Sequence, residues 1–177
     1  GAIHDGIDPY GGHTRRALEL IEYSAELDPL SPIINVGAGI PLHIARRYEE
    51  AAARYRSVLD TETKFVPGHY YLGMTLEMLG GCDTAIEHYK LSVEIAGPIT
   101  LYLGALAHVY ARAGRPADAE RVIEQLHTLG KQRYTSPYNL AVAYMGLDRF
   151  DESLTALEAA LEEHNAWIWF VPVDPRF

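Results

Sequence analysis

The sequence has little cysteine and no long apolar run. Its 177 residues contain one cysteine, Cys82, which cannot form a disulfide within the chain, so folding requires no oxidising compartment. No apolar stretch approaches the roughly 20 residues that a membrane-spanning helix needs, and no signal-peptide pattern opens the chain. We therefore expect a cytoplasmic protein. Because the chain starts without Met and stops abruptly, we also expect a truncated piece of a longer protein, with any targeting segments outside it.

Basic residues are also scarce. The chain has 15 lysines and arginines against 24 aspartates and glutamates, which gives a net charge of −9. A surplus of acid argues against direct binding to nucleic acid or to an anionic membrane surface. Hydrophobic residues make up 48% of the chain and charged residues 22%, as in a folded soluble protein and unlike a disordered one.

Motifs for catalysis are missing as well. The stretch Gly37-Ala38-Gly39 lacks the third glycine and the preceding strand of a phosphate loop, so we interpret it as helix packing. None of the eight histidines accompanies a nucleophile in a recognisable motif. The pairs Glu49-Glu50 and Glu162-Glu163 are typical of solvated helix faces. Cys82 is better explained as a small packed side chain than as a reactive thiolate. We predict no enzyme activity, no catalytic residue and no cofactor.

The first 13 residues form an irregular lead-in with four glycines and a proline. Their side chains His4, Asp5, Asp8 and His13 have the right atoms for a metal ion, but the spacing matches no defined site, so we predict no metal. The alternative function rests on this loop. It would be a small-molecule or metal-binding domain, or the regulatory part of an enzyme such as a kinase or cyclase, with its site there.

What the sequence does contain is a pattern that recurs every 34 residues. Small residues recur at Ala17, Ala51, Ala85, Ala119 and Ser153. Four positions later come the large residues Ile21, Tyr55, Tyr89, Ile123 and Leu157. Twelve positions before the small residues lie Gly39, Gly73, Ala107 and Ala141. This period is typical of stacked helix pairs, in which small residues let two helices approach closely and large ones fill the gap to the next pair.

The period predicts nine helices, arranged as a partial repeat and four complete ones. The partial repeat, 14–31, has one helix at 14–27, with Thr14 as its N-cap. The complete repeats are 32–65, 66–99, 100–133 and 134–167. Their first helices, the A helices, are predicted at 33–45, 67–79, 100–113 and 136–146. Their second helices, the B helices, are predicted at 47–60, 82–95, 116–129 and 150–163. Residues 168–177 are predicted to be an extended apolar tail.

These residues resemble the tetratricopeptide repeat family. The run Leu106-Ala107-His108-Val109-Tyr110, followed by Gly114 and Ala119, matches the family pattern, and the resemblance covers residues 14–167. It implies an all-α, right-handed solenoid of about four and a half repeats, with the A helices lining the concave face. It also implies a non-catalytic protein-interaction, scaffold or sensory module.

The end of the chain also resembles a narrower group of proteins. Residues 134–138, 141–144 and 173–177 resemble the C-terminal repeat regions of bacterial multidomain signalling proteins. In those proteins the repeats follow a DNA-binding, kinase or cyclase domain. The resemblance implies the regulatory C-terminal part of a larger bacterial signalling or transcription protein.

Equivalent positions on the A helices define a candidate binding groove. Its residues are Val36, Ile40, His43, Tyr70, Met74, Glu77, His108, Arg112, Tyr138, Val142 and Met145. Family members that grip chaperone carboxylates use a lysine–asparagine–lysine–arginine clamp here, which this chain lacks. The mostly apolar set favours a protein or peptide with an apolar segment, or another domain of the same polypeptide. We expect these side chains to bury little surface in the free protein. The alternative is that they pack under a loop or under the apolar tail.

The two ends of the stack suggest self-association. The helix at 14–27 lacks its partner, and the helix at 150–163 is followed only by the run 167–171. Solenoid ends need polar caps to stay soluble, so we expect contacts between copies through one end, more readily the N-terminal one. The alternative is a monomer capped by the lead-in and the tail.

Overall fold

The computed structural model describes residues 13–177, except for the side chains of residues 13–18 and Glu22. Within this range it contains nine α-helices, one 3-10 helix and no strand. The helices are α1 (His13–Leu27), α2 (Pro32–Ile44), α3 (Tyr48–Thr61), α4 (Val66–Met78), α5 (Cys82–Ala96), α6 (Thr100–Arg112), α7 (Pro116–Gly130), α8 (Pro137–Gly146), α9 (Phe150–Glu162) and the 3-10 helix η1 (Ala166–Phe170). Every α-helix begins and ends within one residue of its predicted position.

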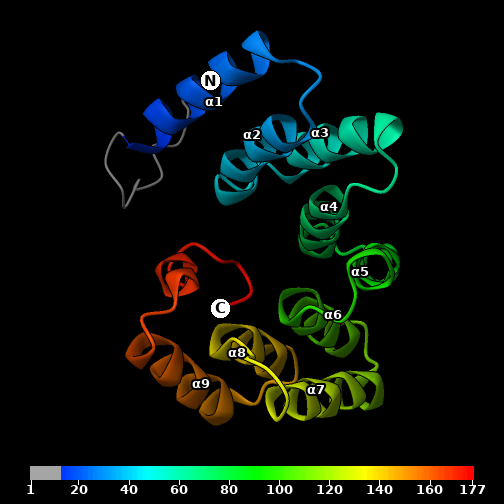
Figure 1. Cartoon of the computed structure of the whole chain (residues 1–177), viewed down its shortest axis with the longest axis vertical. Helices are drawn as coiled ribbons and strands as arrows, with labels where there is room; N and C mark the ends of the chain where they lie inside the picture. The colour runs from blue at the N-terminus through cyan, green and yellow to red at the C-terminus, as the bar shows by residue number, and fades with distance from the viewer. Residues whose placement is uncertain (1–12) are drawn as a thin grey trace.

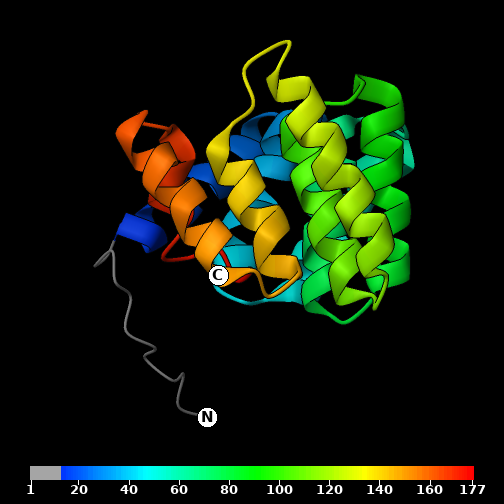
Figure 2. The same cartoon turned by 90° about the horizontal axis from the view of Figure 1, so that it is seen from below.

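The helices stack side by side into a curved solenoid (Figures 1 and 2). The A helices α2, α4, α6 and α8 contact one another in turn along the inner side, and each packs on its own B helix. The all-α solenoid expected from the sequence is confirmed. No helix in the described range has the length and apolar character to cross a membrane.

The small positions of the A helices lie between the two helices of a repeat, but the large residues that face them fill that same space, and not only the predicted gap to the next repeat. A Cβ atom on Gly73 of α4 would lie 2.9 Å from the ring of Tyr89 on α5, and Gly39 meets Tyr55 even more closely. Both tyrosine side chains are fully buried. The missing side chains therefore let each tyrosine fill the space between the two helices of its repeat.

The turns between A and B helices repeat in the same way. Their left-handed residues are Arg46, Gly80, Gly114 and Asp148, with φ of 60°, 82°, 72° and 56°. These four positions follow one another at 34-residue steps. Glycine adopts this conformation without strain, whereas a side chain costs about 1 kcal/mol there.

The buried apolar residues form two clusters. The larger runs continuously from Val36 in α2 to Tyr144 in α8. The smaller joins α8 and α9 to the last part of the chain: it contains Tyr138, Val142 and Ala160, packed against Leu157, Trp167, Ile168, Val171 and Phe177. The solenoid thus has a core of its own, separate from the packing at its C-terminal end.

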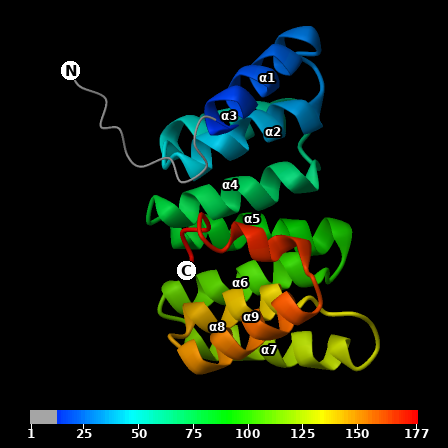
Figure 3. The same cartoon turned by 90° about the vertical axis from the view of Figure 1, so that its left-hand side faces the viewer.

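Residues 166–177, here called the closing segment, differ from the extended tail that the sequence predicted. The segment begins as η1, folds into turns and returns along the inner side of the solenoid (Figures 1 and 3). The side chain of Asn165 starts this turn by accepting a hydrogen bond from the backbone N–H of Trp167 at 3.0 Å. Folding back also buries apolar surface of Trp167 and Phe177, which an extended tail would leave in water.

Candidate functional site

The concave face carries the predicted groove residues, but it is covered. Eight of the eleven are buried, Ile40 and Met145 are half-buried, and Arg112 is exposed. The expectation that these side chains bury little surface is therefore wrong. Neighbouring A helices cover part of the set, and the closing segment covers much of the rest.

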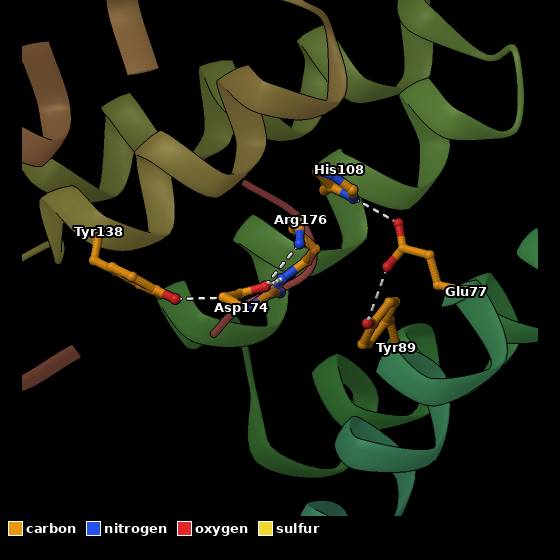
Figure 4. Close-up of polar contacts among 6 residues, drawn as sticks. All are labelled: Glu77, Tyr89, His108, Tyr138, Asp174 and Arg176. Atoms are coloured by element: carbon orange, nitrogen blue, oxygen red, sulfur yellow. Dashed lines mark hydrogen bonds and ion pairs between the residues drawn. The ribbon is translucent and has the colours of Figure 1, made fainter. Parts of the chain in front are cut away.

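Tyr138 makes the main contacts between the concave face and the closing segment. Its ring lies 6.3 Å from that of Trp167 and 5.7 Å from that of Phe177, measured between centroids. Its hydroxyl donates a hydrogen bond to Oδ2 of Asp174 at 2.6 Å (Figure 4). A cavity of about 110 Å³ remains between the segment and α2, α4 and α8. Among its lining residues are five predicted groove residues: Ile40, His43, Tyr70, Met74 and Tyr138.

The closing segment brings a buried ion pair into the groove. The guanidinium of Arg176 bonds the carboxylate of Asp174, with Nη2 at 2.6 Å from Oδ2 and Nε at 2.9 Å from Oδ1. The two side chains are only 4% and 6% exposed. Burial by itself would raise the pKa of Asp174, but the charge of Arg176 and the hydroxyl of Tyr138 hold that pKa below its usual range. The carboxylate is therefore charged at neutral pH.

A second polar pair joins adjacent repeats. Nδ1 of His108 on α6 lies 2.5 Å from Oε1 of Glu77 on α4, and the hydroxyl of Tyr89 donates to Oε2 of Glu77 at 3.4 Å (Figure 4). Both side chains of the pair are buried. A cavity of about 420 Å³ lies beside them, lined also by Arg112, Met145 and the end of the closing segment. The structure thus brings together groove residues that the sequence placed in separate repeats.

His43 lies at the edge of the first cavity. Its Nδ1 is 2.9 Å from Oγ1 of Thr75, and its Nε2 is buried without a partner among the described residues. Burial, and next the positive charge of Arg176, lower the pKa of His43 to about 4. His43 is therefore neutral near pH 7.

A histidine pair that the sequence did not single out lies between α4 and α5. Nδ1 of His69 and Nδ1 of His88 are 2.9 Å apart, and Nε2 of His69 bonds the carbonyl oxygen of Thr63. In the neutral pair, His69 donates from Nε2 and accepts from His88. Burial, and next the nearby His69, lower the pKa of His88 to about 4.

Metal and thiol chemistry find little support in the described residues. They contain no group of three or more histidine, cysteine, aspartate or glutamate side chains that could hold a metal ion. His4, Asp5 and Asp8, and the side chain of His13, lie outside what the structure describes. Cys82 is half-buried, and burial raises the pKa of its thiol, so it is not an activated thiolate.

The residues that sequence reasoning missed are Trp167, Asp174, Arg176 and Phe177. They lie outside the repeated helix pairs, where the 34-residue pattern gives no information. One signal was present, because Asp174 and Arg176 are opposite charges two positions apart in an otherwise apolar stretch. Such spacing can neutralise both charges locally and allow burial.

Apolar side chains are exposed at both ends of the stack. Around α1 and the start of α2 they are Leu20, Tyr23, Leu27, Leu30 and Ile33. On α9 they are Phe150, Leu154 and Leu161. Among the described side chains, both ends of the stack therefore expose apolar surface.

Comparison with known sequences gives one family. Residues 105–163, from within α6 to the residue directly after α9, match the tetratricopeptide repeat family. No curated protein sequence matches the chain.

Several solved structures share the fold. MamA superposes with a TM-score of 0.60 at 17% identity, over 93% of this chain and 98% of MamA. A tetratricopeptide repeat protein from Parabacteroides merdae gives a TM-score of 0.60 at 17% identity, over 90% of this chain and 64% of that one. YrrB, described as a tetratricopeptide repeat protein with an unusual peptide-binding site, gives 0.53 at 21% identity, over 85% and 78%. At these identities the likeness shows the fold alone.

Proposed function

We propose that this chain, which has the tetratricopeptide repeat fold and matches that family over residues 105–163, is a non-catalytic interaction module. Its concave face binds a protein or peptide that carries an apolar segment. This face offers rings and aliphatic side chains on the A helices, with few free charges. Such a surface suits a segment recognised through its side chains.

The observation that supports this proposal most is the occupant of the groove. A 12-residue stretch of the chain, the closing segment, already lies there against Tyr138 and beside Tyr70 and Met74. A face that accommodates one peptide segment has the width and chemistry to accommodate another. The peptide-binding site named for YrrB is consistent with this use of the fold.

We place the module in the cytoplasm, as the regulatory C-terminal part of a larger bacterial signalling or transcription protein. The resemblance of residues 134–138 and 173–177 to such proteins supports this context, and the net charge of −9 disfavours direct contact with DNA or membranes. The complete gene tests it. An output domain fused before the repeats is expected, and a gene that encodes the repeats alone would contradict it.

Peptide selection tests the groove itself. A library of random 12-residue peptides displayed on phage is panned on the intact chain, and the affinities of the enriched peptides are measured by fluorescence anisotropy. We expect peptides rich in aromatic and aliphatic residues. We expect Met74→Glu to weaken them at least ~10-fold, because a carboxylate in an apolar groove must lose its hydration on binding.

The control is Leu154→Glu, which adds the same charge on the exposed face of α9. Circular dichroism checks that both variants are folded, and Ile40→Glu, at a half-buried position lining the same cavity, repeats the test if Met74→Glu unfolds. Equal affinity for the groove variants and the control would place the peptide elsewhere. No enrichment above background, either on the intact chain or on the folded variant Phe177→Ala, in which the closing segment loses a contact to Tyr138, would refute the proposal.

We also propose that copies of the chain associate through the apolar end formed by α1 and the start of α2. Leu27 and Leu30 are 68% and 88% exposed there, which is unusual for two neighbouring leucines in a soluble protein. Light scattering over a dilution series tests this. The mass is expected to rise with concentration and to fall back with Leu27→Glu/Leu30→Glu, whereas a monomer mass throughout would rule it out.

A further inference from the structure

The closing segment is held to the solenoid by side chains alone. Its backbone hydrogen bonds join only residues 165–177, for example Val173 N–H to the carbonyl of Phe170 and Phe177 N–H to the carbonyl of Asp174. Nothing in its backbone pairs with α2, α4, α6 or α8. A segment bound in this way can leave without breaking any helix of the stack.

The packing of the segment is also separate and incomplete. Four of its apolar residues, Trp167, Ile168, Val171 and Phe177, pack in the small cluster with α8 and α9, and the large core from α2 to α8 contains none of its residues. Trp169 remains 80% exposed and Phe170 41% exposed, although both are large apolar residues. The segment therefore gains less burial than its composition allows, so its hold on the groove is weaker than that of the helices on one another.

Charge explains which segments can occupy this groove. A buried arginine needs a counter-ion, and among the described groove residues no buried carboxylate is free to supply one. The groove's own buried carboxylate, Glu77, is engaged by His108 and Tyr89. The guanidinium of Arg176 bonds the carboxylate of Asp174 in the same segment. The groove adds only tyrosine hydroxyls, that of Tyr70 to Arg176 and that of Tyr138 to Asp174. An incoming arginine must therefore bring its own carboxylate.

We propose that the closing segment is an internal ligand that competes with the partner of this groove. The partner carries the same chemistry: an aspartate and an arginine two residues apart that pair with each other, next to aromatic side chains. This inference rests on the proposed function and adds to it the partner's chemistry and the means of regulation. The groove is closed while the segment is seated and open when it is displaced.

A peptide with the sequence of residues 166–177 tests the competition. Labelled with fluorescein, it is added to the intact chain and to the full-length variant Asp174→Ala, and anisotropy gives its affinity. The variant leaves Arg176 without a counter-ion, so the chain's own segment should leave the groove. We expect the variant to bind the peptide at least ~10-fold more tightly than the unmodified chain.

Two controls keep the result specific. Glu152→Ala removes the carboxylate partner of an exposed arginine, Arg149, and should leave the affinity unchanged. A peptide in which alanine replaces both the aspartate and the arginine should bind Asp174→Ala at least ~10-fold more weakly than the original peptide. Circular dichroism shows whether Asp174→Ala is folded, and Phe177→Ala, which weakens the segment at another contact, repeats the measurement if it is not.

Each outcome decides between the proposals. Equal affinity of the unmodified chain and the variant overturns the competition, and equal affinity of the two peptides overturns the role of the charged pair. A folded variant that binds the phage-selected peptides but not the segment peptide leaves the proposed function intact and overturns this inference. A folded variant that binds neither overturns both.

Discussion

Tyr89 and Tyr138 are both almost fully buried, yet they are buried in different ways. Tyr89 lies between α4 and α5, opposite Gly73, in a position that recurs in every complete repeat. Tyr138 lies on the concave face under the closing segment, which belongs to no repeat. The comparison teaches that equal exposure does not imply equal contribution to folding. Burial by the stack is part of the solenoid core, whereas burial by the segment can be reversed without unfolding it.

The sharpest way to break the comparison is to remove each ring in turn. Tyr89→Ala should reduce the free energy of unfolding by about 4 kcal/mol, because it leaves a cavity between two packed helices. Tyr138→Ala should cost less, about 2 kcal/mol, because the closing segment can leave and the face can hydrate. Urea denaturation followed by circular dichroism measures both.

Fluorescence separates the two effects, since the only two tryptophans, Trp167 and Trp169, lie in the closing segment. Tyr138→Ala should red-shift their emission without denaturant, and Tyr89→Ala should not. Equal losses of stability with no shift in either variant would show that segment and solenoid form one cooperative unit.

The next largest effect is expected from acid, which should destabilise the folded protein by protonating His43. The pKa of His43 is about 4 in the folded protein, lowered by burial and by Arg176, against about 6.5 when unfolded. Between these two pKa values the unfolded chain binds more protons than the folded chain. The stability that neutral His43 contributes is therefore fully present above pH 6.5 and is lost as the pH falls towards 4. The full effect is about 3 kcal/mol.

Thermal melts from pH 7 to pH 4 measure this loss. His43→Gln cannot titrate, so its stability should fall less steeply over the same range. Tyr138→Ala should also flatten the profile, because departure of the segment removes Arg176 and hydrates His43. Parallel profiles for all three proteins would rule out His43 as the source.

The smallest expected effect concerns the repeated part of the molecule, at a turn position that recurs in every repeat. Arg46 occupies, with φ of 60°, the turn position that is glycine in two other repeats. Arg46→Gly should stabilise the protein by about 0.5–1 kcal/mol, since relief of the left-handed strain exceeds the added entropy of the unfolded chain. Gly80→Ala should lower the free energy of unfolding by a similar amount, and urea denaturation measures both changes. A destabilised Arg46→Gly would contradict the common role of this turn.

The sequence allowed the helices to be predicted closely because the same contact is made in every repeat. Gly39 and Gly73 are small for one reason, the tyrosine that faces each of them, so a repeated residue type reports a repeated contact. The groove positions were assigned from the resemblance to the repeat family, and their role in binding stays a prediction.

Contacts that occur at one place only, and not in every repeat, could not be predicted from the 34-residue pattern. The closing segment meets Tyr138, and His69 meets His88, without any counterpart 34 residues away. Gly104 is similar: a Cβ there would lie 2.5 Å from the carbonyl oxygen of Asn139, a close approach of α6 and α8 that the pattern gave no reason to expect. Contacts of this kind depend on three-dimensional placement, which no local pattern encodes.

The place of the closing segment has a mechanical consequence. A stack in which each repeat touches only its neighbours behaves as a spring, because small rotations at successive interfaces add up along its length. Residues of α2 and of α8 line one cavity with the closing segment, so the segment lies between the first and the last A helix. We expect the distance between the two ends to vary less while the segment is seated than after it has been displaced.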